Sequence, residues 1–414
     1  MSRTPPPQIA VTGLGLVTPA GIGVEATWTG VVSGRPTAAA DPQLAGLPVD
    51  FSCRVPGFDP TTNPDTRSST TGPARLDRFA LFALAAAREA LADARLDPAT
   101  WDGARVGVVI GSAAGGVGTL EAQHSRMLGP DPALPSPLLL PMFLPNMAAG
   151  ALAAESGARG PCLHVSTACA SGATALGTAL GLLRADACDV VLAGGAEAMI
   201  TRLCAAGFAK LGALSRGRAG PTHASRPFDA ARDGFVLGEG AGIFVLERAA
   251  DARARAVRPH AILAGYGASA DAYHPVAPDP AGAGAAAAVR AALADADAGP
   301  GDVEHVNAHG TSTPAGDRIE ATTLRRVLGE RPSVTSVKGV TGHTLGAAGA
   351  IEAAITVLTL ARGSVPPTAN LTEPGEGIEI DLVSGTARAQ SPRFALSESF
   401  GFGGQNAVLA FAAV

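Results

Sequence analysis

Charge and long apolar runs are both scarce in this sequence, and each scarcity excludes a class of protein. Only 16% of the 414 residues are charged and the net charge is −5, so the overall balance excludes a strongly basic, nucleic-acid-binding protein. No segment reaches the roughly 18 consecutive bulky apolar residues of a membrane-spanning helix. The first residues, MSRTPPPQIAVTG, contain no apolar stretch of signal-peptide length, and we therefore expect a cytoplasmic protein.

Cysteine and lysine are scarce as well. The five cysteines are odd in number and lack metal-ligand spacing, which predicts reduced thiols rather than a disulfide framework or a metal site. They are Cys53, Cys162, Cys169, Cys188 and Cys204. Lysine occurs only as Lys210 and Lys338, so a lysine inside a motif is conspicuous.

The residues that are abundant predict a large α/β protein. A chain of 414 residues exceeds one typical core of roughly 100–200 residues. Apolar runs at residues 105–112 and 189–197 predict buried strands, and residues 76–94 have apolar positions at helical spacing. Alternating strands and helices predict parallel sheets covered by helices. Residues 113–160 are rich in Pro, Met and Gly, and we expect them to be irregular.

Two segments of the chain echo each other. EALADARLDP, residues 89–98, and AALADADAGP, residues 291–300, are both Ala-rich, turn at a proline and lead into a predicted strand. This echo predicts two similar halves, residues 1–255 and 256–414, without a flexible linker between them. Coincidence between Ala-rich segments is the alternative.

The stretch VSTACASGATALGTAL places Cys169 between a strand-like and a helix-like run. At the beginning of a helix, the unpaired N–H groups and the helix dipole stabilise a thiolate, so we expect a lowered pKa and a nucleophilic sulfur. The small neighbours leave room for an acyl group, and the same N–H groups can hold an oxyanion. A buried structural cysteine is the alternative.

Three further motifs contain residues suited to the same chemistry. NAHGTST places His309 after an apolar strand, and SVKGVTGHTLGAAGAIEA places His343 at a helix start with Lys338 and Glu352 nearby. A neutral imidazole can donate a hydrogen bond that polarises a carbonyl, although a lone histidine in a loop is more often structural. SESFGFGGQNAVLAF predicts a tight turn at Phe402 whose backbone N–H groups point into a site, or else a simple hairpin turn.

In this order, TACASG, NAHGTST, KGVTGHTLGAAG and SFGFGGQN resemble the signature motifs of β-ketoacyl-acyl-carrier-protein synthases in the thiolase superfamily. RPFDAARDGFVLGEGAG and SADAYHPVAPDP add further matches, and the resemblance runs nearly from end to end. It implies an α/β, thiolase-like fold with duplicated halves in a layered α-β-α-β-α architecture. It also implies a decarboxylative Claisen condensation of malonyl-carrier protein with a cysteine-bound acyl chain, which elongates a fatty acid or a polyketide.

The resemblance implies catalytic roles for four residues and a supporting role for a fifth. Cys169 is the nucleophile that accepts the acyl chain, and His309 and His343 bind the thioester carbonyl of the malonyl unit. Lys338, also assigned to the catalytic set, and Glu352 form an ion-pair network behind the histidines, with a surface salt bridge as the alternative. The implied chemistry needs no metal and no redox cofactor, because its substrates are carried on the phosphopantetheine of a carrier protein.

Five positions match the oxyanion hole, the gate and the pantetheine contacts of the family. The backbone N–H groups of Cys169 and Phe402 are the implied oxyanion hole, and Phe402 is also the implied gate. Asp271 lies in the loop that faces this gate. Thr311 and Thr313 match contacts to the pantetheine arm, whereas helix capping is their alternative role.

The resemblance also implies protein partners. An acidic acyl carrier protein should meet a basic patch, for which the candidates are Arg67, Arg75, Arg78, Arg126, Arg202 and Lys210. The chain should form a homodimer, or a heterodimer with a chain-length-factor-like subunit, and bind neither nucleic acid nor membrane. Glu239 lies in a motif that we interpret as structural.

Some positions depart from the fatty-acid pattern. Elongating fatty-acid members usually have NSFGFGGTN where this chain has Glu398 and Gln405, and they lack the pair Gly339–Val340. These differences favour a polyketide ketosynthase subunit over a housekeeping fatty-acid synthase. Two alternatives are a non-decarboxylating acyltransferase of the same fold, against which both histidines argue, and a non-catalytic dimer partner, against which Cys169 argues.

Overall fold

The strands of the computed structural model, which describes residues 6–59 and 75–414, form one long hydrogen-bonded path with two similar halves. In the first half the order is β6-β5-β7-β8-β1, and in the second it is β11-β10-β15-β16-β9. The first-half strands are β1 (Ile9–Thr18), β5 (Val106–Gly111), β6 (Cys162–Val165), β7 (Val190–Glu197) and β8 (Gly240–Arg248). The second-half strands are β9 (Ala261–Ala270), β10 (His305–Asn307), β11 (Ser333–Thr335), β15 (Phe394–Gly401) and β16 (Gln405–Ala412).

Strand direction repeats between the halves as closely as strand order does. β5 is parallel to β6 and β7, just as β10 is parallel to β11 and β15. The remaining neighbours, β7-β8-β1 and β15-β16-β9, are antiparallel. The halves meet where Ile9–Val11 of β1 pairs with Ala261–Leu263 of β9. The sheet is mixed, so the prediction of parallel sheets was wrong in part. Parallel neighbours need a long crossover connection, and the connection between β15 and β16 is too short for one.

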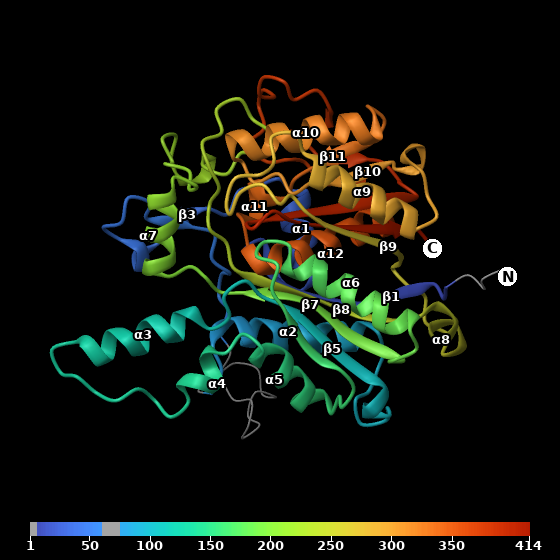
Figure 1. Ribbon diagram of the computed structural model, residues 1–414, viewed down its shortest axis with the longest axis horizontal. Coiled ribbons are helices and arrows are strands. Elements are labelled where there is room, and N and C mark those ends of the chain that lie inside the picture. Colours follow the sequence, from blue (N-terminus) through green and yellow to red (C-terminus); the bar gives the residue numbers. More distant parts are fainter. Residues whose placement is uncertain (1–5, 60–74) are drawn as a thin grey trace.

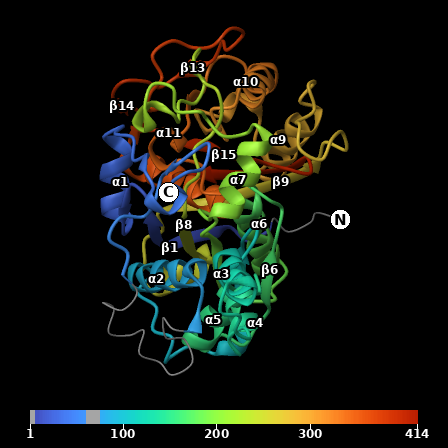
Figure 2. The ribbon, with the colours of Figure 1, turned by 90° about the vertical axis from the view of Figure 1, so that its left-hand side faces the viewer.

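The helices complete five layers (Figures 1 and 2). In the middle layer, α6 (Ser171–Arg184) and α12 (Ala348–Arg362) pack against each other and against strands of both halves. The outer face of the first half is covered by α2 (Arg78–Asp93) and α5 (Met147–Ser156). On the second half, α9 (Ala283–Asp295) covers the sheet and α10 (Pro314–Leu328) packs beside it. This arrangement confirms the predicted α-β-α-β-α architecture.

The echoed segments occupy equivalent places in the two halves. EALADARLDP ends α2, after which the chain enters β5, and AALADADAGP ends α9, after which the chain enters the equivalent strand β10. The boundary placed between residues 255 and 256 lies in the connection between β8 and β9 and stays a prediction.

The other elements are short or peripheral. The helices are α1 (Val24–Val32), α3 (Val117–Leu128), α4 (Leu139–Phe143), α7 (Arg202–Leu211), α8 (Ala249–Ala254) and α11 (Lys338–Thr341). The strands are β2 (Gly21–Ile22), β3 (Ala39–Ala40), β4 (Phe51–Ser52), β12 (Ser364–Val365), β13 (Asp381–Leu382) and β14 (Arg388–Ala389). Residues 113–160, predicted to be irregular, contain α3, α4 and α5, because Gly and Pro fall mostly between these helices.

Small residues let the two middle-layer helices approach each other closely. A Cβ added to Gly172 of α6 would lie 2.6 Å from the backbone nitrogen of Ala350 in α12. A Cβ added to Gly349 of α12 would lie 2.8 Å from the backbone nitrogen of Ala173 in α6. The small residues after Cys169 therefore serve helix packing, and the prediction that they also leave room for an acyl group stays a prediction.

Among the described residues, one helical stretch is long and apolar enough to cross a membrane. It is Leu345–Arg362, which includes α12, and 89% of it is buried inside the protein. A helix that is apolar on all sides is expected at the centre of a large core, and α12 lies between two layers of strands. We therefore interpret this stretch as a core helix, while the cytoplasmic location stays a prediction.

Candidate active site

Cys169 lies between β6 and α6, immediately before the N-cap residue Ala170. The preceding residue, Ala168, has a φ of 50°, so the chain turns sharply into the helix. The Ser171 hydroxyl donates to the carbonyl oxygen of Ala168 over 2.6 Å and holds this turn. The cysteine is buried with 8% of its surface exposed, and the backbone N–H of Phe402 donates to its thiol sulfur. The predicted position at the helix start is confirmed.

The predicted lowering of the Cys169 pKa was wrong for this arrangement. Burial raises the pKa of the Cys169 thiol to about 12, although the charge of Lys338 and the Phe402 N–H act in the opposite direction. Desolvation of a thiolate outweighs these favourable contacts when the sulfur is enclosed. The resting site therefore holds a protonated thiol, and acyl transfer must remove its proton.

His343 comes from the second half but is tied to the first. Its backbone N–H donates to the carbonyl oxygen of Val236 over 2.7 Å, and its carbonyl accepts from the N–H of Gly238 over 2.9 Å. The Phe235 ring meets the imidazole edge-on, with ring centres 5.3 Å apart. These contacts fix the position of a side chain that is 2% exposed.

His309 follows β10, and its ring lies next to that of His343. The ring centres are 5.3 Å apart and the ring planes are nearly perpendicular, at 84°. The Glu320 carboxylate of α10 accepts the His309 N–H over 2.6 Å and the Gly310 N–H over 2.7 Å. The structure therefore brings together the two histidines that the sequence predicted as partners.

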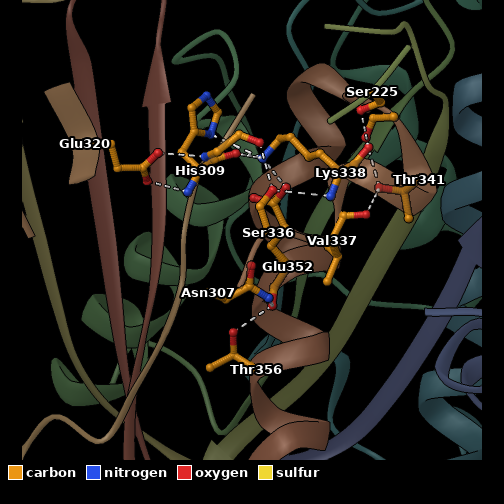
Figure 3. Close-up of polar contacts among 12 residues, drawn as sticks. Ser225, Asn307, His309, Glu320, Ser336, Val337, Lys338, Thr341, Glu352 and Thr356 are labelled. Carbon is orange, nitrogen blue, oxygen red and sulfur yellow. Dashed lines mark hydrogen bonds and ion pairs between the residues drawn. The ribbon is translucent and has the colours of Figure 1, made fainter. Parts of the chain in front are cut away.

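Lys338 connects His309 with Glu352, as Figure 3 shows. Its ammonium ion-pairs with the Glu352 carboxylate, donates to the His309 carbonyl over 2.5 Å and lies 3.4 Å from Nδ1 of His309. Because an ammonium only donates, Nδ1 must accept and the ring proton of His309 lies on Nε2. The side chains of Lys338 and Glu352 are 1% and 3% exposed, which excludes the surface salt bridge.

Both imidazoles are neutral at physiological pH. Burial, followed by the charge of Lys338, lowers the pKa of His309 and of His343 well below 6.5. Burial raises the pKa of Glu352 to about 7, while Lys338 acts against this increase. The site thus contains two uncharged hydrogen-bond donors beside one fixed positive charge.

The turn between β15 and β16 carries Phe402. Asp271 holds this turn: its backbone N–H donates to the carbonyl of Gly404 over 2.8 Å, and its carboxylate accepts from the Asn406 amide over 2.7 Å. The Phe402 ring is half-buried, 6.4 Å from the ring of Phe208 in α7. The hairpin turn and the site-facing N–H are therefore both present, and the gating role of Phe402 stays a prediction.

Thr311 and Thr313 lie between His309 and α10. Their hydroxyl oxygens are 3.0 Å apart, and both residues are half-buried. Thr313 is the N-cap residue of α10, yet its side chain makes no capping hydrogen bond. The alternative role of Thr313 in helix capping is therefore not supported, and the contact with the pantetheine arm stays a prediction.

Sequence reasoning missed two buried carboxylates that support the site. One is Glu320, which holds the turn after His309. The other is Glu197 at the end of β7, which accepts from the N–H of Ala113 over 2.6 Å and of Gly346 over 3.2 Å. Glu197 thus links the first half to the segment after His343. For Glu197, the available signal in the sequence was an acidic residue at the end of an apolar strand.

Two surface cavities lie near α10 rather than at Cys169. Their volumes are about 400 Å³ and about 340 Å³, and both are lined by Ala315 and Arg318. Neither is lined by Cys169 or His309, which are 8% and 7% exposed. Within residues 6–59 and 75–414, no group of three His, Cys, Asp or Glu side chains is arranged to hold a metal ion, and all five cysteines are free.

The candidates for the predicted basic patch differ in their partners and in their exposure. Arg67 lies outside the described residues. Arg78 binds the buried Glu239 carboxylate through two nitrogens, at 3.1 and 2.7 Å, and stacks over the Phe82 ring, and its contact with a carrier protein stays a prediction. The remaining candidates are exposed and stay predictions: Arg75, Arg126, Arg202 and Lys210.

Comparisons with known proteins agree with this geometry. The family model for the β-ketoacyl synthase N-terminal domain matches residues 7–252, and the model for the C-terminal domain matches residues 260–372. The 3-oxoacyl-(acyl-carrier-protein) synthase 2 of Synechocystis sp. is 42% identical over 98% of this chain and 97% of that protein. The protein of the same name from Vibrio harveyi is also 42% identical, over 98% of both chains.

Solved structures of similar proteins cover almost the entire chain. The ishigamide ketosynthase/chain length factor has a TM-score of 0.92 and 32% identity, covering 99% of this chain and 100% of that chain. A type II PKS acyl-carrier protein in complex with its ketosynthase bound to the hexaketide has a TM-score of 0.89, with the same identity and coverage.

Proposed function

This chain belongs to the β-ketoacyl synthase family, and on this basis we propose that Cys169 carries the acyl chain while His309 and His343 activate the malonyl unit. The protein is an acyltransferase, a β-ketoacyl-acyl-carrier-protein synthase. The observation that best supports these roles is the position of two neutral imidazoles, 5.3 Å apart, beside the lysine whose charge reaches Cys169.

The first half-reaction transfers the acyl chain to Cys169. The sulfur forms a bond to the thioester carbonyl carbon, the bond from that carbon to the carrier sulfur breaks, and the Cys169 thiol proton passes to the departing carrier thiolate. The backbone N–H groups of Cys169 and Phe402 hold the oxyanion of the tetrahedral intermediate. Movement of the half-buried Phe402 ring admits the chain to a sulfur that is only 8% exposed.

The second half-reaction forms the carbon–carbon bond. Nε2–H of His309 and a ring N–H of His343 donate to the malonyl thioester oxygen. The bond to the carboxylate then breaks, and its electron pair forms an enolate as CO₂ leaves. The enolate carbon attacks the acyl-cysteine carbonyl, the carbon–sulfur bond breaks, and the cysteine leaves as a thiolate that takes a proton from water. We propose that no metal or redox cofactor takes part, because decarboxylation itself supplies the electron pair.

Within the family, we place the chain first with polyketide ketosynthase subunits. Glu398, Gln405 and the pair Gly339–Val340 depart from the fatty-acid motif in the direction of that class. The fatty-acid pathway is the second candidate, and the curated relatives named 3-oxoacyl-(acyl-carrier-protein) synthase 2 support it.

We propose an acyl carrier protein and a second thiolase-fold subunit as partners. Arg202 and Lys210 lie on the exposed face of α7, whose Phe208 contacts the gate residue Phe402. Strand β6 lies at the edge of the sheet and carries no charged residue, so it is suited to pairing with another subunit.

Reconstitution with purified carrier proteins tests the function. The protein is mixed with acyl- and malonyl-carrier protein, and mass spectrometry follows acyl-Cys169 and the carrier-bound product. We expect the original protein to extend the chain by two carbons with loss of CO₂. Cys169→Ala should form no acyl-enzyme, whereas the control, Cys204→Ala, should still form it. A Cys169→Ala protein that still forms a covalent acyl-enzyme excludes the nucleophile.

The same assay separates the two pathways. With a ketoreductase, a dehydratase and an enoyl reductase added, a fatty-acid enzyme should use saturated acyl chains for repeated extension. A polyketide enzyme should extend its own unreduced or partly reduced products instead. Omission and addition of a co-purified partner subunit shows whether a heterodimer is needed.

A further inference from the structure

A second buried carboxyl group lies behind His309. Glu398 of β15 is 1% exposed and contacts the side chain of Glu320, which is 4% exposed and belongs to α10. Two carboxylates in such a contact, away from water, cannot both carry a negative charge without a large cost in free energy. One proton shared between them removes the repulsion and supplies the missing hydrogen bond.

The two carboxyls have very different surroundings. Glu320 accepts the backbone N–H groups of His309 and Gly310, and the positive charge of Lys338 also stabilises its ionised form. Within the described part of the chain, Oε1 of Glu398 has no hydrogen-bond partner, and neither do the neighbouring Ser397 and Ser399 hydroxyls. The donors therefore favour a negative charge on Glu320 and a neutral carboxyl at Glu398.

Charge balance around the pair leads to the same assignment. The charged groups that act on the pair are Asp317 and Lys338, and the neutral His309 lies beside it. Lys338 is already ion-paired with Glu352, and Asp317 lies 3.5 Å from Arg232. An ionised Glu398 would add an uncompensated negative charge to a fully buried cluster.

We propose that Glu398 is protonated in the working enzyme and donates its O–H to the Glu320 carboxylate, so that the pair positions the His309 turn for condensation. This inference rests on the proposed role of His309. It makes Glu398 a positioning residue, because the chain of contacts runs from Glu398 through Glu320 to the backbone of His309 and Gly310. The asparagine found here in fatty-acid members is likewise neutral and able to donate.

The pKa directions agree with this placement of the proton. Burial, and then repulsion by Glu320, raises the pKa of Glu398 well above 4.5, whereas burial raises the pKa of Glu320 to about 7. Because the folded-state pKa of Glu398 lies above its unfolded value, the free energy of unfolding should fall as pH rises from about 4.5 through the folded pKa.

Infrared difference spectroscopy of the full chain locates the proton directly. At pH 8.5, where carboxyls of pKa about 7 are ionised, we expect one protonated carboxyl band that shifts in D₂O and disappears in Glu398→Gln. The control is Glu89→Gln. Glu89, like Glu320, accepts two backbone N–H groups, and the Glu89→Gln protein should keep the band. Persistence of the band in Glu398→Gln, or its absence from the original protein, overturns the proposal.

Kinetics then tests the positioning role. Glu398→Ala should slow condensation about 10- to 100-fold, the usual cost of a misplaced catalytic group, while acylation of Cys169 stays within about threefold. Glu398→Gln, which keeps a neutral donor, should recover most of this loss and shift any alkaline decline of kcat to higher pH. Equal loss in both variants overturns the donor role.

Two further outcomes are distinguishable. If a bound monovalent cation rather than a proton balances Glu398, replacing K⁺ by tetramethylammonium at constant ionic strength will reduce activity, and this result also overturns the proposal. If the original protein does not acylate Cys169, the proposed function fails. The proton on Glu398 is still tested in that case, because the infrared measurement needs no turnover.

Discussion

Three hydrogen-bonding groups around Lys338 decide what His309 can do. The ammonium has three donors, which meet the Glu352 carboxylate, the His309 carbonyl and Nδ1 of His309. Because Nδ1 is occupied as an acceptor, the proton of the neutral ring must be on Nε2, where it can be donated. A lysine that is 1% exposed thus sets the tautomer of its neighbour.

This arrangement predicts separate effects on the two half-reactions. His309→Ala and His343→Ala should still form acyl-Cys169 but should lose condensation by about 10²- to 10³-fold, the usual cost of removing one donor to a developing oxyanion. Mass spectrometry of acyl-enzyme and product in one reaction measures both. The exposed His124→Ala is the control, and normal condensation by either site variant removes that histidine from the mechanism.

At the scale of single residues, the motifs were sufficient to identify Cys169, His309 and His343 as candidates. They were not sufficient for Glu320, since a glutamate in an amphipathic helix such as α10 looks the same whether it faces solvent or a neighbouring strand. The pKa of Cys169 was also misjudged. The helix start is a local feature, whereas desolvation depends on distant segments that enclose the sulfur.

Among the elements, α7 is placed to connect the proposed carrier-protein docking surface with Phe402, the proposed gate. Its N-cap residue is Thr201, whose side chain accepts the N–H of Cys204, and its C-cap residue is Gly212, with a φ of 76°. One side of the helix packs through Phe208 against Phe235 and Phe402, while Arg202 and Lys210 are exposed.

Charge reversal on α7 should therefore weaken binding of the acidic carrier protein. For Lys210→Glu we expect the KM for the carrier protein to rise about three- to tenfold, roughly 1 kcal/mol, with a smaller effect at high salt. kcat with a short pantetheine thioester should not change. Arg290→Glu on the outer helix α9 is the matched control. An unchanged KM for Lys210→Glu places the docking surface elsewhere.

In the whole molecule, one end of the strand path lies in the first half. β6 ends the strand path, and its Cys162 and Leu163 are exposed, with Leu163 at 39%. The arm formed by α3 and α4 extends from the same half (Figure 1). This arm carries six exposed apolar side chains, Leu120, Met127, Leu128, Leu134, Leu140 and Leu144. A symmetric partner would satisfy the edge strand and cover these side chains.

A charge on this edge should consequently prevent association. We expect the native protein to have the mass of a dimer in light scattering, and Leu163→Lys to have the mass of a monomer with an unchanged circular dichroism spectrum. Ile22→Lys, which also adds a charge at an exposed apolar position, should remain dimeric. A native protein that is monomeric without an added subunit contradicts the homodimer, and a dimeric Leu163→Lys contradicts pairing through β6.

The sequence by itself predicted the α/β class and the repeated halves, and its motifs singled out Cys169, His309 and His343 as candidates, because periodicity and short motifs are local properties of the chain. Only the tertiary structure decided which side chains are buried together. It placed Glu320 and Glu398 behind His309, assigned the small residues of α6 to packing against α12, and enclosed the sulfur enough to raise its pKa to about 12. Desolvation and charge repulsion depend on residues far apart in the chain, and only folding brings these together.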